Sequence, residues 1–337
     1  MALIDVQDLQ VRLQTQRGPA TAVRSLSFAM ERGETLGLVG ESGCGKSITA
    51  MSLLGLLPEG AQVSGSIRFD GEELVGRTEQ DLCRLRGNRI GMIFQEPMTA
   101  LNPVHSIGRQ VAEPLRLHRG LGAAEARRKA VAMLDRVGIP DAARRFDAYP
   151  HQFSGGQRQR ITIAMALVCE PDLLIADEPT TALDVTIQQQ ILDLIGELVT
   201  ERQMAMILIS HDLGVIAQNV DRMMVMYGGS VVESGPTDSV FTDMAHPYSR
   251  GLFGARPSLT SQRGQRLVTI PGTVPELADL PAGCPFAGRC PHTVDACTAL
   301  PPSVAEVGPA HAVRCSRWEW IRDLPPSNKA TSSGATA

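Results

Sequence analysis

The chain has 337 residues, 43% of them hydrophobic and 20% charged, with a formal net charge of −4. This acidic balance gives no basic footprint for nucleic acid, so we expect no nucleic-acid partner. No apolar run approaches the roughly 18 residues of a membrane span, and Asp5 and Asp8 interrupt any signal-peptide core. These features indicate a reducing cytoplasm, where disulfides are rare.

Taken in chain order, the predicted elements begin with half-buried antiparallel strands, because apolar and polar residues alternate over the first 35 positions. Continuous apolar runs predict further strands buried on both faces, at 35–40, 90–95, 173–177, 205–210 and 222–227. Helices are expected at about 45–57, in three stretches between 106 and 169, and at 184–203. Strands that alternate with helices indicate an α/β fold with a parallel sheet and a helical insertion.

The end of the chain has a different composition. Prolines and glycines become dense beyond residue 255, and the periodicity is lost. We therefore interpret this part as an appended segment without a large core, followed by a disordered tail at 325–337.

The stretch GESGCGKS at 40–47 matches the pattern G-x-x-x-x-G-K-[ST] between a predicted strand and a predicted helix. In such a loop, backbone N–H groups surround phosphates, and the helix N-terminus adds the positive end of its dipole. Lys46 is expected to reach the β- and γ-phosphates, and the Ser47 hydroxyl to ligate Mg²⁺. The expected nucleotide-binding residues of this segment are Gly40, Glu41, Ser42, Gly43, Cys44, Gly45, Lys46, Ser47 and Ile48.

A second acidic motif, LLIADE at 173–178, ends a predicted buried strand in two carboxylates. Asp177 is expected to hold Mg²⁺, directly or through water. Glu178 is expected to act as general base for the water that attacks the γ-phosphate.

The motif SGGQ at 154–157 resembles the signature motif of ABC ATPases, and other motifs of that family follow the same order. Gln95 matches the Q-loop glutamine, TALD at 181–184 resembles the D-loop with Asp184, and His211 matches the switch histidine. The resemblance covers residues 1 to about 255. It implies a P-loop NTPase core with an antiparallel β subdomain and a helical insertion.

The resemblance also implies roles. Gln95 and His211 would contact the γ-phosphate and metal region, with His211 catalytic and Gln95 a Mg²⁺ ligand. ATP would lie between this subunit and a second homologous ATPase, whose nucleotide is bound by the signature residues Ser154, Gly155, Gly156 and Gln157. One position departs from the family: Leu13 stands where an aromatic usually stacks on adenine, so we expect looser base discrimination.

Two longer stretches, at 94–110 and 270–297, resemble the ATPases of dipeptide, oligopeptide and nickel importers. The resemblance implies an ATPase peripheral on the cytoplasmic face of the inner membrane, below two transmembrane permeases, with about 96–110 receiving a coupling helix from the permease. An extracytoplasmic substrate-binding protein would deliver the cargo. Di- and oligopeptides are the expected cargo, nickel or a metallophore is the alternative, and a soluble repair or translation ATPase is the rival of another class.

Four of the seven cysteines fall in the appended segment with the spacing C-x5-C-x6-C-x17-C: Cys284, Cys290, Cys297 and Cys315. The candidates are a structural zinc, an iron–sulfur cluster or no bound metal. The C-x2-4-C knuckles of zinc sites are absent there, whereas four thiolates also suit a [4Fe–4S] cluster. The resemblance favours the cluster over Zn²⁺, with His292 and His311 as reserve ligands. We expect the cluster to order the chain from about residue 270 onward without affecting the phosphate loop.

The sequence thus predicts four parts. They are a RecA-like ATPase core with its β subdomain at 1–97 and 161–255, a helical signature subdomain at 98–160, a C-terminal extension with the cysteine cluster at 256–324, and the tail at 325–337.

Overall fold

The structure, a computed structural model, describes residues 2–180, 184–254 and 269–324. The predicted tail at 325–337 and the first three residues of the predicted D-loop, 181–183, lie outside the described residues. Among the described residues, no helix is both long enough and apolar enough to cross a membrane.

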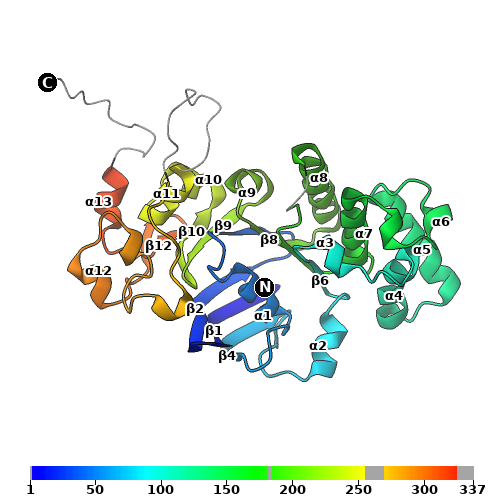
Figure 1. Cartoon of the computed structure of the whole chain (residues 1–337), viewed down its shortest axis with the longest axis horizontal. Coiled ribbons are helices and arrows are strands. Elements are labelled where there is room, and N and C mark those ends of the chain that lie inside the picture. Colours follow the sequence, from blue (N-terminus) through cyan, green and yellow to red (C-terminus); the bar gives the residue numbers. More distant parts are fainter. Residues whose placement is uncertain (1, 181–183, 255–268, 325–337) are drawn as a thin grey trace.

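The main sheet of the described chain has eight strands in the order β11-β12-β10-β9-β3-β8-β7-β6 (Figure 1). Their bounds are β3 Thr35–Val39, β6 Ile90–Ile93, β7 Leu173–Asp177, β8 Ala205–Ser210, β9 Arg222–Tyr227, β10 Ser230–Pro236, β11 Ala305–Gly308 and β12 His311–Val313. Parallel pairing joins β6 through β7, β8 and β3 to β9, which confirms the parallel α/β sheet.

Each central strand is buried on both faces. The described chain has two hydrophobic cores, one on each face of the main sheet. In β7, Leu174 and Ala176 contribute to the first core, whereas Leu173 and Ile175 contribute to the second core. Because successive side chains point to opposite faces, a continuous apolar run is what such a strand requires. The five apolar runs in the sequence therefore located the central strands correctly.

A second sheet, antiparallel in the order β2-β1-β4-β5, packs against the second core together with α1 (Lys46–Leu53). Its strands are β1 Ile4–Thr15, β2 Gly18–Met30, β4 Gln62–Phe69 and β5 Glu72–Glu73. The predicted antiparallel start of the chain is confirmed. Helix α1 ends before the expected position, because Gly55 turns into the left-handed region with φ 62°.

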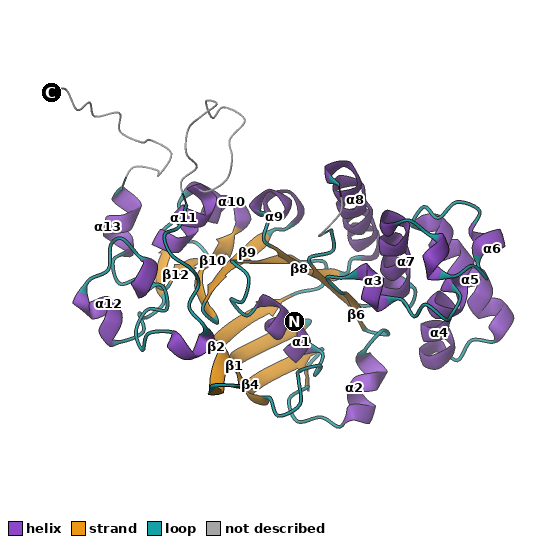
Figure 2. Cartoon of the chain, viewed as in Figure 1, coloured by secondary structure: helices purple, strands orange, loops and turns teal. Residues whose placement is uncertain are grey.

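The remaining helices form a group at one end of the molecule and a layer over the main sheet (Figures 1 and 2). The end group contains α3 Pro97–Ala100, α4 Ile107–Arg119, α5 Ala123–Arg136, α6 Ala142–Arg145, the 3-10 turn η1 Pro150–Gln152 and α7 Gly155–Leu167. The layer over the main sheet contains α8 Val185–Arg202, α9 Leu213–Asn219, α10 Thr237–Thr242 and α11 Pro247–Gly254, whereas α2 Glu79–Leu85 lies apart from it, on the side of α1 and the antiparallel sheet.

The C-terminal extension lies at the opposite end of the molecule from this helical group (Figure 1). It contains η2 Leu277–Asp279, η3 Ala287–Arg289, α12 Asp295–Ala299, the hairpin β11–β12 and α13 Trp318–Asp323. Strand β12 pairs antiparallel with β10, so the extension continues the main sheet. The sequence did not predict this, because strands of three and four residues carry no readable periodicity.

Candidate active site

The loop at 40–47 leaves β3 at its carboxyl end and enters α1, and two of its glycines allow the tight path. Gly40 has φ 152°, and a Cβ there would lie 2.2 Å from the Met226 carbonyl oxygen. Gly45 has φ 105°, and a Cβ there would lie 2.6 Å from the Ala22 carbonyl oxygen. Any side chain at either position would collide with backbone.

Lys46 is folded back into this loop. The side chain is buried, and its Nζ donates to the carbonyl oxygens of Gly40 at 2.7 Å and Glu41 at 3.2 Å. These acceptors are neutral, so phosphate oxygens, which carry charge, would be stronger partners for the ammonium. The loop therefore has the geometry of an anion cradle at a helix N-terminus.

Asp177, the last residue of β7, is also buried, and one of its carboxylate oxygens has no hydrogen-bond partner among the described residues. Burial raises the pKa of this carboxyl, and a hydrogen bond from Ser47 opposes that shift. A buried carboxylate oxygen without a partner, next to a hydroxyl, offers the oxygen ligands that Mg²⁺ prefers. These residues fit the expected metal ion.

Glu178 brings three predicted residues together. Its Oε2 lies 3.2 Å from Nε2 of Gln95 and 3.2 Å from Nδ1 of His211. Gln95 follows β6, Glu178 follows β7 and His211 follows β8, so all three side chains come from the carboxyl ends of neighbouring parallel strands. Ligands of open α/β sheets bind at this edge.

The predicted signature stands apart from this cluster. Ser154 caps α7: its hydroxyl accepts from the Gln157 amide at 3.3 Å, and the Gln157 side chain accepts from the Ser154 amide at 3.2 Å. Ser154 and Gly155 are exposed. In Figure 1, α7 belongs to the helical group at one end, whereas α1 lies near the middle. The signature is thus an exposed, capped helix N-terminus.

Two further predicted residues, Asp184 and Leu13, make local structural contacts. Asp184 caps α8, because its side chain accepts from the Ile187 amide at 3.0 Å. Leu13 is half-buried, pairs with Ala20 across the β1–β2 hairpin and packs against the second core.

The four cysteines of the extension line one small cavity, together with His246 and His292. All four are free thiols. In the described part of the chain, however, no group of three or more His, Cys, Asp or Glu side chains has the arrangement of a metal-ion site. The iron–sulfur assignment therefore stays a prediction.

His311 is not a reserve ligand, contrary to the expectation. Its ring is buried, and Nε2 lies 2.9 Å from Oε1 of Glu233, which is itself buried. The Glu233 carboxylate also accepts from the amides of Ala245 and His246. This pair joins β12 to β10 and to the start of α11, so His311 has a structural partner.

Sequence reasoning missed Arg289, which contacts the phosphate loop. Its guanidinium pairs with the Glu41 carboxylate, with Nη1–Oε2 2.7 Å and Nη2–Oε1 3.2 Å. The extension therefore contacts the phosphate loop directly, and the expectation that losing the cluster leaves the loop unaffected stays a prediction. Nothing in the sequence signalled this pair, because the two residues lie 248 positions apart.

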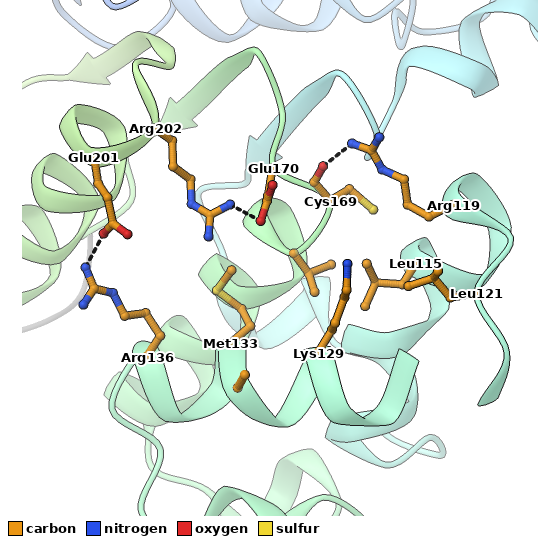
Figure 3. A pocket seen from close by; sticks show the side chains of 12 residues that line it. Leu115, Arg119, Leu121, Lys129, Met133, Arg136, Cys169, Glu170, Glu201 and Arg202 are labelled. Atoms are coloured by element: carbon orange, nitrogen blue, oxygen red, sulfur yellow. Dashed lines mark hydrogen bonds and ion pairs between the residues drawn. The ribbon is translucent and has the colours of Figure 1, made fainter. Parts of the chain in front are cut away.

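A cavity of about 670 Å³ opens elsewhere, between α4, α5 and the segments that enter β7 and β8 (Figure 3). Two of its arginines already have carboxylate partners, since Arg202 pairs with Glu170 and Arg136 with Glu201. It lies at the amino ends of the strands, opposite to the edge where parallel sheets bind ligands. This cavity is not the nucleotide site.

Comparison with known proteins agrees with this geometry. The ABC transporter family model matches residues 23–181, and the model for the oligopeptide/dipeptide transporter C-terminal region matches residues 232–297. The oligopeptide transport ATP-binding protein OppD of Salmonella typhimurium is 52% identical over 89% of this chain and 89% of its own length. A Brucella melitensis protein named for peptide import and ATP binding is 51% identical over 95% of this chain and 98% of its own length.

Solved structures show the same fold. A dimeric ATP-binding cassette in a post-hydrolysis state, bound to ADP and Pi, superposes with a TM-score of 0.62 at 25% identity, over 69% of this chain and 98% of its own. A Clostridium perfringens component of an ABC transporter complex gives 0.60 at 29% identity, over 72% and 91%. The chain therefore belongs to the ATP-binding subunits of ABC transporters, in the group that carries the oligopeptide/dipeptide C-terminal region, and it is an ATPase of that family.

Proposed function

We propose that this chain is the ATP-hydrolysing subunit of an importer for di- and oligopeptides. The observation that carries the hydrolytic part is the contact of Glu178 with Gln95 and His211 at the sheet edge that also holds the phosphate loop. The peptide cargo is supported by the C-terminal region match and by the names of the relatives.

The geometry of the described residues supports a role for each. Lys46 exchanges the loop carbonyls for β- and γ-phosphate oxygens of ATP. Ser47, Asp177 and Gln95 would hold Mg²⁺, which when bound would supply positive charge beside these phosphates. Glu178 accepts a proton from the attacking water.

His211 completes this arrangement. Its ring is largely exposed and already contacts Glu178, so it can turn toward the γ-phosphate without leaving the site. Orienting the water and the phosphate is the part of phosphoryl transfer that a protein supplies, since the transition state needs little covalent help.

We propose that two ATPase subunits act together. The exposed N-terminus of α7, with Ser154, Gly155, Gly156 and Gln157, binds the γ-phosphate held by a second homologous ATPase. Asp184, which follows the part of the predicted D-loop outside the described residues, lies at the same interface. Closing the two subunits around ATP couples hydrolysis to their movement.

We propose that the segment 96–110 receives a coupling helix from one of two transmembrane permeases. Val104 within it is 72% exposed, and Phe94 just before it is 46% exposed, which are apolar surfaces a partner would cover. The subunit is then peripheral on the cytoplasmic face of the inner membrane, and an extracytoplasmic substrate-binding protein supplies the cargo to the permeases. The four predicted domain boundaries are retained in this proposal.

We further propose that Cys284, Cys290, Cys297 and Cys315 hold a [4Fe–4S] cluster, with Zn²⁺ as the rival. The support is that the four thiols line one cavity of the extension. When bound, the cluster cross-links a segment with few core residues, as metals commonly do. Protein purified without oxygen should be brown and contain iron and sulfide, whereas Cys290→Ser should lose both. Colourless protein with stoichiometric zinc would assign the site to Zn²⁺.

Reconstitution tests the whole function. The subunit, co-expressed with candidate peptide permeases from the same genome, should co-purify with its cognate pair in detergent. In vesicles, ATP hydrolysis should rise when peptide-loaded substrate-binding protein is added. Stimulation by nickel-loaded protein alone would replace the peptide cargo, and failure to bind any permease would exclude a transporter subunit.

A further inference from the structure

Arg289 belongs to the C-terminal extension but reaches into the phosphate loop. It ends η3, between Cys284 and Cys290, and its side chain is only 6% exposed. Both terminal nitrogens face the Glu41 carboxylate, which is 28% exposed. A planar guanidinium matches a carboxylate in this two-bond geometry, which a lysine ammonium cannot reproduce.

The same guanidinium also donates hydrogen bonds to the backbone at the start of the extension. Its Nε donates to the Pro271 carbonyl oxygen at 2.8 Å, and Nη2 donates to the Gly272 carbonyl oxygen at 3.2 Å. Nη1 lies 3.4 Å from the Tyr227 hydroxyl at the end of β9. One buried side chain therefore connects the extension, the main sheet and the phosphate loop.

On the loop side, Glu41 stands beside the residues that handle phosphate. Its amide donates to the Tyr248 hydroxyl at 2.8 Å, and its carbonyl oxygen accepts from Lys46 at 3.2 Å. The residue is thus held at its amide, its carbonyl and its carboxylate. Release of the carboxylate would free the first turn of the loop to move the carbonyl against which Lys46 rests.

A second contact joins the extension to the neighbouring hairpin. Arg17, in the turn between β1 and β2, pairs with Asp279 through two 2.7 Å contacts and with Glu276 at 3.0 Å. This contact is exposed, with Arg17 at 55%, so it is weaker than the buried pair. It nevertheless shows that η2 packs against the β1–β2 hairpin.

We propose that Arg289 is a positioning residue of the ATP site: by holding Glu41 it fixes the phosphate loop in its phosphate-accepting shape, so the C-terminal extension sets the affinity for ATP. The inference rests on the proposed binding of ATP at Gly40–Ser47. Arg289 itself does not touch the nucleotide.

Thermodynamic linkage adds a second consequence. If a docked extension raises ATP affinity by some factor, bound ATP must favour the docked extension by the same factor. ATP should therefore slow hydrogen exchange of the amides of Cys284 and Cys290, which donate to carbonyls within the extension. A purely structural Arg289 would not produce this effect.

The experiment measures ATP binding in full-length protein that carries Glu178→Gln to prevent turnover. Arg289→Gln and Glu41→Gln are expected to weaken ATP binding on the order of ten-fold each, because a charge-assisted pair is lost. The double variant should be no weaker than the singles, since both remove one interaction. The matched control is Arg317→Gln, which removes another arginine of the extension, one that donates to the His292 carbonyl and stacks on Trp320.

The results distinguish a wrong role for Arg289 from a wrong position for the ATP site. Wild-type affinity in Arg289→Gln, with ATP binding lost in Lys46→Ala, would overturn the inference and leave the nucleotide site intact. Wild-type affinity in Lys46→Ala would overturn the nucleotide site itself. Equal weakening in Arg289→Gln and Arg317→Gln would show general loosening of the extension, against the inference.

The proposal can still be tested if Arg289→Gln does not fold, by using Glu41→Gln and hydrogen exchange. Should Arg289→Gln not fold, Glu41→Gln keeps the size of the side chain and every backbone contact of the loop. ATP-dependent slowing of exchange at Cys284 and Cys290 is expected in the parent protein and lost in Glu41→Gln. The same slowing in both proteins would contradict the proposal.

Discussion

The phosphate loop and the C-terminal extension are stabilised in different ways. The loop takes much of its shape from neighbours in sequence, which are a strand before it, a helix after it, glycines at the tight positions and Lys46 bonded to loop carbonyls, and Arg289 adds one distant contact through Glu41. The extension takes its position from distant residues, through β12 on β10, His311 on Glu233 and Arg289 on Glu41. The loop is therefore specified mainly by contiguous residues, whereas the extension depends on the finished core.

This difference separates the residues that carry out hydrolysis from the residues that hold the extension on the core. Substitutions at the strand ends should stop hydrolysis without unfolding anything. Substitutions between the extension and the core should change stability or affinity and leave the chemical step intact. The following predictions test this separation, from the largest expected effect to the smallest.

Glu178→Gln should lower ATP turnover roughly a hundredfold or more, because a general base contributes a factor of about 10²–10⁴. ATP binding should persist, since the Gln side chain keeps the size of Glu and Asp177 is untouched. Steady-state phosphate release and equilibrium ATP binding measure the two effects. Glu197→Gln, at an exposed position of α8, is the control, and undiminished turnover in Glu178→Gln would remove Glu178 from its role.

Ser154→Arg should bring hydrolysis by the assembled transporter to background, because a long cation would fill the space where the partner's phosphate binds. The isolated subunit should keep its own ATP affinity, since its phosphate loop is unchanged. Ser154→Thr retains the helix cap and should be active. A loss of affinity in the isolated Ser154→Arg subunit as severe as in Lys46→Ala would contradict a site shared between two subunits.

Glu233→Ala should destabilise the docking of the extension while ATP turnover per folded molecule stays unchanged. The buried carboxylate serves two amides and His311, so its loss leaves three donors without an acceptor. At about 1–3 kcal/mol for each buried group, the free energy of unfolding should fall by about 3 kcal/mol or more. Thermal unfolding measures this, with Glu306→Ala, exposed on β11, as control.

Arg17→Gln should have the smallest effect: slightly faster protease cleavage in the extension at low salt, and none at high salt. Its ion pairs with Asp279 and Glu276 are exposed, so water and salt screen them. Arg12→Gln, on the same hairpin, should cleave like the unmodified chain. A large, salt-independent increase for Arg17→Gln would show that this contact matters as much as the buried pair of Arg289.

The same division explains what the sequence could predict. The phosphate loop and LLIADE were readable because their residues are contiguous. The meeting of Gln95, Glu178 and His211 was implied by the family motifs, and it follows physically because parallel strands present their carboxyl ends at one edge. The Arg289–Glu41 pair and the His311–Glu233 pair could not be predicted, because only the folded chain brings such distant positions together.

Strand β12 has a consequence for how the protein is made. It pairs with β10 at Glu233 and Ser234, and those positions have no cover on that edge until residues 311–313 emerge from the ribosome. Translation needs on the order of several seconds for this interval. During that time the core presents an open edge strand, which is a template for pairing with another chain. The β11–β12 hairpin therefore covers the edge of β10 only late in synthesis. Chains that end prematurely before β12 are the ones expected to aggregate.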